Sequence, residues 1–184
     1  MRAVEDGAKL RRERQRISYF YGIRGSAEGF KNKYGRIREY VQKDYGFTVF
    51  VAQTPQDVWF QKDAFFEEIV ARAVQNRRQV YVMGVSAGAN LALWYSARYP
   101  QIGRVLCVNP VLSLNLDLTL AGVRNFCGEK MAIVLGAKDS SAKWAKVIPR
   151  QKNIHINILP CADHLFSGML EEFIALPKRF LFES

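Results

Sequence analysis

The chain has 184 residues, of which 49% are hydrophobic and 24% are charged, and its formal net charge is +10. This length and composition are typical of one globular domain that buries its core without disulfides or metals. No apolar run approaches the roughly 18–20 residues of a membrane-spanning helix, and the polar stretch 1–16 does not resemble a secretory signal, so we expect a cytoplasmic protein.

The excess of positive charge is scattered along the chain and is densest in the opening residues 1–16. We interpret these residues as a basic, solvated N-terminal arm, followed by a single domain over 17–184. A basic chain can bind phosphates, but no helix-turn-helix, zinc finger or aromatic RNA-binding motif is present. We therefore do not expect nucleic-acid binding as the main function. The three cysteines are not spaced as zinc ligands, and we expect them to be reduced.

Apolar runs and amphipathic stretches alternate along the rest of the chain. Short runs rich in β-branched and aromatic residues predict six strands, at 17–22, 47–52, 79–85, 104–108, 130–135 and 155–159. Apolar residues at helical spacing predict helices. The helices are expected over Phe30 to Val41 with an end before Gly46, over 57–76, over 87–98, around Trp144 to Pro149, and over 166–176.

Strands that alternate with helices need crossover connections, which place the strands parallel. The sequence therefore predicts an α/β fold: a three-layer sandwich with a doubly wound, mostly parallel six-stranded sheet and helices on both faces. The segment 111–130 allows two interpretations, because leucines alternate with polar residues from Leu112 to Leu120. It is either an extended flap or the approach to a helix capped by Asp117.

The pentapeptide from Gly84 to Gly88 has the form G-x-S-x-G, with Ser86 at its centre. An apolar strand runs directly into it and a helix follows it, which is the context of a nucleophile elbow. The helix start behind Ser86 places N–H groups and a positive dipole end where an oxyanion would form. Ser86 is therefore the candidate nucleophile.

A serine hydroxyl needs a base, and the chain has only two histidines. His155 begins an apolar run and is expected at a strand edge, whereas His164 follows the last strand and is the candidate base. Asp139 follows the strand 130–135 and is the candidate acid, with Asp117 as the substitute. Asp163 adjoins His164 in sequence and is poorly placed to reach back to its ring.

These features resemble the α/β-hydrolase family over nearly the whole chain from Ile17. The resemblance rests on the strand–GVSAGA–helix unit, on Asp139 after a strand, and on PCADHLFSG near the end. It implies a sheet with the second strand at one edge, and the Ser, Asp and His loops at the carboxyl ends of the strands. The two leading antiparallel strands of the family and a cap domain are missing, so we expect a minimal, uncapped core.

The family resemblance also implies an oxyanion hole formed by two backbone N–H groups, which we assign to Ile23 and Ala87. In the corresponding loop Tyr21 stands where the family often has histidine, while Gly22 remains. Arg24 follows Ile23 and is either a substrate-binding residue that pairs with a carboxylate or phosphate, or a solvent-facing loop arginine.

The resulting functional hypothesis is a serine hydrolase that cleaves a carboxylic ester or thioester of small-molecule size through an acyl-enzyme, with no metal or organic cofactor. Two alternatives remain. An acyltransferase would use the same triad, and a non-catalytic relative would keep the fold for partner binding.

Overall fold

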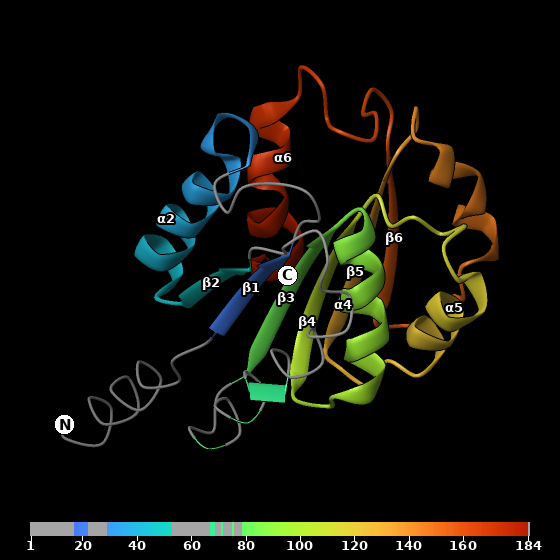
Figure 1. Ribbon diagram of the computed structural model, residues 1–184, viewed down its shortest axis with the longest axis horizontal. Coiled ribbons are helices and arrows are strands. Elements are labelled where there is room, and N and C mark those ends of the chain that lie inside the picture. Colours follow the sequence, from blue (N-terminus) through green and yellow to red (C-terminus); the bar gives the residue numbers. More distant parts are fainter. Residues whose placement is uncertain are drawn as a thin grey trace, which may run out of the picture.

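The computed structural model describes residues 17–21, 29–52, 67, 68, 71, 75 and 79–183. Within these residues six strands form one sheet in which every neighbouring pair is parallel (Figure 1). The strands are β1 (Ile17–Tyr21), β2 (Thr48–Ala52), β3 (Val80–Val85), β4 (Ile102–Val108), β5 (Lys130–Gly136) and β6 (Ile154–Leu159). Their order is β2-β1-β3-β4-β5-β6, so β2 lies at an edge, as expected.

Helices cover both faces of this sheet and confirm the three-layer prediction (Figure 1). On one face lie α4 (Ala87–Arg98), α5 (Leu116–Arg124) and the 3₁₀ turns of η2 (Ser140–Val147). On the other lie α2 (Lys33–Tyr45), α6 (Leu170–Pro177) and the terminal π-helical η3 (Lys178–Phe182). The short η1 (Phe30–Asn32) precedes α2.

The central strands are continuous apolar runs because both of their faces are covered. Every residue of β3 is buried. Alternate side chains of β3 enter different cores: Val80 and Val82 pack under α4 and α5, whereas Tyr81 and Met83 pack under α2 and α6. The two cores hold the carboxyl ends of the strands in fixed positions.

Several helix ends differ from the sequence-based expectation. The leucine-rich segment contains the helix α5, but its cap is Asn115, whose side chain accepts a hydrogen bond from the Leu118 N–H at 3.2 Å. Asp117 lies inside the first turn. The final helix begins at Leu170 rather than at 166, because Phe166 and Gly168 have φ angles of +57° and +74°. Gly46 ends α2 with a φ of +68°, as predicted.

The expected helix 57–76 lies mostly outside the described residues, among which 67, 68, 71 and 75 are helical. The basic arm 1–16 lies outside them entirely. In the part of the chain that the structure describes, no helix combines the length and apolarity needed to cross a membrane. The thiol of Cys107 is buried against α4, while Cys127 and Cys161 are exposed free cysteines.

Candidate active site

Ser86 stands at the sharp turn between β3 and α4, with φ and ψ angles of 56° and −128°. A residue other than glycine rarely adopts a positive φ, and such strain gathers at functional sites. The Ser86 N–H donates to the Val108 carbonyl of the neighbouring strand at 2.9 Å, and its own carbonyl accepts from the Ala89 N–H at 2.9 Å. These bonds fix the side chain at the carboxyl end of the sheet.

The turn requires the glycine that precedes it. A Cβ atom at Gly84 would lie 2.3 Å from the Gly88 carbonyl oxygen and 2.6 Å from the Ala89 Cα. The first turn of α4 therefore approaches β3 so closely that no side chain fits between them. This close approach explains the glycine before the serine in the G-x-S-x-G pattern.

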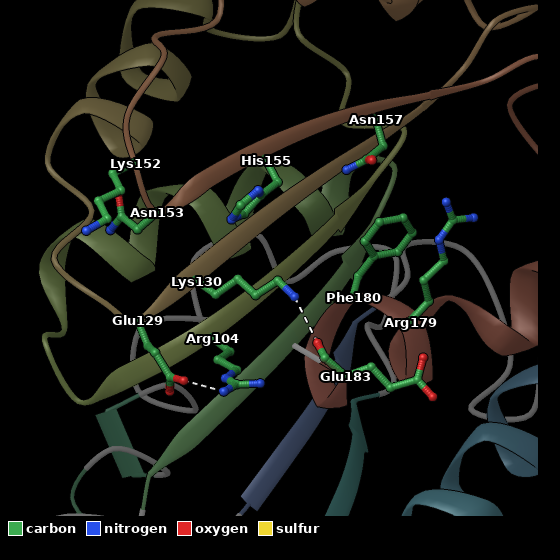
Figure 2. Close-up of a pocket in the computed structure, with 10 residues that line it drawn as sticks. All are labelled: Arg104, Glu129, Lys130, Lys152, Asn153, His155, Asn157, Arg179, Phe180 and Glu183. Atoms are coloured by element: carbon green, nitrogen blue, oxygen red, sulfur yellow. Dashed lines mark hydrogen bonds and ion pairs between the residues drawn. The ribbon is translucent and has the colours of Figure 1, made fainter.

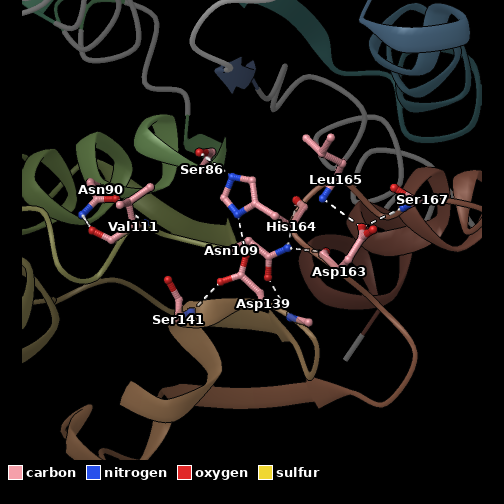
Figure 3. Close-up of polar contacts among 11 residues, drawn as sticks. Ser86, Asn90, Asn109, Val111, Asp139, Ser141, Asp163, His164, Leu165 and Ser167 are labelled. Carbon is pink, nitrogen blue, oxygen red and sulfur yellow. Dashed lines mark hydrogen bonds and ion pairs between the residues drawn. The ribbon is translucent and has the colours of Figure 1, made fainter.

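The structure brings Ser86, His164 and Asp139 together from three separate loops (Figure 3). The Ser86 hydroxyl Oγ lies 2.9 Å from His164 Nε2. His164 Nδ1 is bonded to the Oδ2 atom of Asp139. Because a carboxylate only accepts hydrogen bonds, this contact places the imidazole proton on Nδ1 and leaves the Nε2 lone pair facing the serine hydroxyl. A histidine in this state can take the serine proton.

The candidate acid is buried, whereas the candidate base is accessible to solvent. The Asp139 side chain is 1% exposed and the His164 side chain 43% exposed. The second carboxylate oxygen of Asp139 accepts the Ser141 N–H at 2.6 Å, where it also caps η2. Both oxygens thus have partners, and a charge that forms on the imidazole would meet an oriented carboxylate.

The loops that carry Asp139 and His164 are joined through their backbones. The Lys138 N–H donates to the Ala162 carbonyl at 3.0 Å, and the Ala137 N–H donates to Leu159 at 2.9 Å. A Cβ atom at Gly136 would lie 2.4 Å from the Ala162 oxygen, so this position also admits only glycine. The close approach of the two loops sets the distance between the carboxylate and the imidazole.

Asn109, directly after β4, is a residue that the sequence analysis missed. It is fully buried with a φ of +45°. Its Nδ2 donates to the carbonyls of Asp163 at 2.9 Å and His164 at 3.1 Å, and its Oδ1 accepts the Gly136 N–H at 2.7 Å (Figure 3). The only available signal was its place, since it follows a strand whose carboxyl end faces the site.

A second buried amide holds the chain that follows β4. Asn90, one helical turn after Ser86, donates from Nδ2 to the Val111 carbonyl at 3.0 Å and to Thr119 Oγ1 at 3.1 Å. Its Oδ1 accepts the Val111 N–H at 2.8 Å (Figure 3). The segment between β4 and α5 is thereby tied to the helix that begins at the elbow.

The structure also shows where the other candidates, Asp117, Asp163 and His155, lie. Asp117 is exposed in the first turn of α5, and Asp139 rather than Asp117 contacts His164. Asp163 turns back on its own loop, where hydrogen bonds from Ser167 and Leu165 lower the pKa of its carboxyl below the ordinary value. His155 lies exposed on the edge strand β6.

Only half of the expected oxyanion hole lies within the described residues. Ala87 is the first residue of α4, and the first N–H groups of a helix have no partner inside the helix. Its N–H is therefore available to an oxyanion beside Ser86. Ile23 and Arg24 lie outside the described residues.

A cavity of 890 Å³ lies at the opposite ends of the strands and is lined by cationic and amide side chains (Figure 2). Arg104 is paired with Glu129 and donates to the Leu181 carbonyl at 2.7 Å, while the Lys130 ammonium donates to the Glu183 carbonyl at 2.9 Å. These contacts hold the end of the chain against the sheet. Ligands of open parallel sheets bind at the carboxyl ends, so we place the candidate active site at Ser86 and not in this cavity.

No protein-family model and no curated protein matches the sequence. Solved structures do match it. Est1E from Butyrivibrio proteoclasticus matches with a TM-score of 0.73 and 14% identity, over 92% of this chain and 88% of its own. An alpha-beta serine hydrolase homologue from Coxiella burnetii matches with a TM-score of 0.67 and 13% identity, over 89% and 84%. The esterase domain of a Rhodothermus marinus protein matches with a TM-score of 0.64 and 12% identity, over 91% and 89%. The chain therefore has the α/β-hydrolase fold, as the motifs implied.

Proposed function

We propose that the protein is a serine hydrolase that cleaves a carboxylic ester or thioester through an acyl-enzyme. Ser86 is the nucleophile, His164 the general base and Asp139 the acid that orients it. The observation that carries this proposal is the 2.9 Å contact between the Ser86 hydroxyl and His164 Nε2, with Nδ1 of the same ring bonded to a buried carboxylate. The esterase domain among the matching structures supports the same reaction class.

In the first step the Ser86 oxygen attacks the acyl carbon while His164 Nε2 accepts the hydroxyl proton. The tetrahedral oxyanion is stabilised by the Ala87 N–H at the start of α4, and we assign the second donor to Ile23. The bond between the acyl carbon and the alcohol or thiol breaks, and the leaving group takes the proton from His164. Water then attacks the acyl-serine with the same histidine as base, and the carboxylic acid is released.

A fluorophosphonate probe tests this proposal, because it labels only an activated serine. Labelling is expected in the wild type and should map to the peptide that contains Ser86. The Ser86→Ala variant should lose it, while Ser113→Ala, at an exposed serine, should keep it. Labelling of Ser86→Ala on another serine would overturn the assignment. A panel of p-nitrophenyl esters of increasing chain length then defines the preferred acyl group.

A further inference from the structure

A cavity of 410 Å³ lies beside the loop that carries His164, between that loop and the beginning of α2. Leu165 and Phe166, the two residues after His164, form one wall; Phe30 and Lys33 form the facing wall, and Phe173 of α6 also lines it. Its volume lies within the range of small-molecule sites, which is roughly 300–1,000 Å³. The cavity is therefore large enough for part of a substrate.

The walls of this cavity expose unusually large apolar surfaces. Leu165 is 72% exposed and Phe30 is 71% exposed, the highest values among the large apolar residues that the structure describes. We expected the helix to begin at Phe30, whereas Phe30 lies in η1 and α2 begins at Lys33. Exposed apolar side chains that line a cavity indicate a binding site for an apolar ligand.

The backbone around the cavity is strained on both sides. Lys31 and Asn32 have φ angles of +50° and +56° before α2, and Phe166 has a φ angle of +57° in the facing loop. Residues other than glycine adopt this region at a cost in free energy, and such residues cluster at ligand sites. The strain is a second indication, independent of the exposed side chains.

The cavity also contains a cation whose contacts leave it able to bind an anion. The Lys33 ammonium lies 4.2 Å from the centroid of the Phe173 ring and 5.1 Å from that of Tyr34. Across the described ranges no carboxylate pairs with it. Ring faces attract a cation but do not satisfy its three N–H donors, and partial burial lowers the pKa of this lysine. A carboxylate would supply the missing acceptor.

We propose that this cavity binds the acyl chain of the substrate and that Lys33 pairs with a carboxylate carried by that chain. The inference rests on the proposed hydrolase function. It deepens that function, because it defines the substrate as an ester of an apolar dicarboxylic acid. Phe30 and Leu165 contact the methylene chain, and Lys33 selects the anionic end.

The kinetic test compares two esters of equal acyl length, p-nitrophenyl octanoate and the p-nitrophenyl monoester of suberic acid. The Lys33→Met variant should raise KM for the suberate monoester about tenfold more than it raises KM for the octanoate ester. Lys33→Arg should restore the preference. Lys152→Met, at an exposed lysine near the opposite ends of the strands, is the matched control. An equal effect of Lys33→Met on the two esters would overturn the proposal.

A binding test separates this inference from the proposed reaction. Calorimetry on Ser86→Ala should detect suberate binding that is weakened about tenfold by an added Lys33→Met, with weaker binding of the neutral octanamide. Suberate binding without probe labelling of the wild type would overturn the hydrolase proposal alone. Probe labelling without selective suberate binding would overturn the cavity assignment alone. Lys33-dependent sedimentation of the protein with phosphatidylglycerol vesicles, in place of suberate binding, would also overturn the cavity assignment. It would identify a membrane-contacting surface instead.

Discussion

The side-chain amide of Asn109 donates a hydrogen bond to the main-chain carbonyl of His164 at 3.1 Å. The same amide group reaches the Asp163 carbonyl, and its oxygen accepts the N–H of Gly136, three residues before Asp139. One buried side chain thus connects the loop of the proposed base to the loop of the proposed acid. The position of the Asn109 side chain therefore sets the orientation of the imidazole relative to the carboxylate.

We predict that Asn109→Ala lowers kcat about 10²-fold with little change in KM, because a displacement of about 1 Å of catalytic groups has an effect of this size. The free energy of unfolding should fall by about 1–3 kcal/mol, since buried donors and acceptors lose their partner. Steady-state kinetics and urea denaturation measure the two effects separately.

Asn90→Ala is the matched control, because Asn90 is equally buried and also bonds to two segments, but not to the loops of Asp139 or His164. It should be destabilised to a similar extent while its kcat falls far less. Similar losses of kcat in the two variants would mean that Asn109 acts through stability alone.

We predict that Asp139→Asn lowers kcat/KM by up to about 10⁴-fold, because an amide at this position favours the wrong tautomer of His164. Asp117→Asn should be nearly silent, because Asp117 is exposed in the first turn of α5 and it is Asp139 that is bonded to His164. Ester hydrolysis by both purified variants checks this prediction. A crippled Asp117→Asn beside an active Asp139→Asn would move the acid to Asp117.

The residues of the candidate site were readable from the sequence because each has a local signal. Ser86 stands between an apolar strand and a helix with small neighbours, and Asp139 and His164 each follow a strand. Since the carboxyl ends of parallel strands meet at one edge, these positions predict proximity without any knowledge of contacts. Asn109 gives no such signal. Its partners lie 27 and 54–55 residues away, and only the folded sheet brings them together.

The apolar spacing predicted the wrong start for the final helix, because a residue can be buried without being helical. Phe166 fits the apolar spacing of the final helix and is buried, 4% exposed, but it lies in a turn with a positive φ. The Asp163 carboxylate accepts the N–H groups of Leu165 and Ser167 and stabilises that turn in place of a helical one. Apolar spacing reports which side chains face the core, and it does not report the backbone conformation that brings them there.

We predict that Gly136→Ala reduces activity and lowers the free energy of unfolding by about 1–3 kcal/mol. The added methyl group would lie 2.4 Å from the Ala162 carbonyl oxygen, two residues before His164, so the loop of the proposed base must move. At Gly103 the nearest atom would be 3.6 Å away, an ordinary contact, so Gly103→Ala should retain activity and nearly the original stability. Equal behaviour of the two variants in thermal denaturation and ester hydrolysis would contradict the close-packing argument.

We predict that activity on tributyrin rises smoothly through its solubility limit, without a jump when the emulsion forms. The chain between β4 and β5 contains α5 and no separate lid, and Asn90 ties this segment to α4. Without a separate lid in this described segment, an interface has nothing there to open. A pH-stat titration across the limit measures the effect, and a sharp increase above the limit would show that a movable segment covers Ser86.

We predict that Ser86→Gly abolishes hydrolysis and at the same time stabilises the protein. Ser86 has φ and ψ angles of 56° and −128°, a region open to glycine and costly for other residues by about 1–3 kcal/mol. Glycine relieves this strain but loses about 0.5–1 kcal/mol through the greater freedom of the unfolded chain, so the net gain is about 0–2.5 kcal/mol. Ser86→Ala separates the two effects, since it removes the hydroxyl and keeps the strained backbone. It should be inactive without a comparable gain in stability.

Denaturant midpoints of the wild type, Ser86→Gly and Ser86→Ala provide the measurement. A Ser86→Gly protein less stable than Ser86→Ala would mean that the turn stores no strain and that its geometry is set by packing alone.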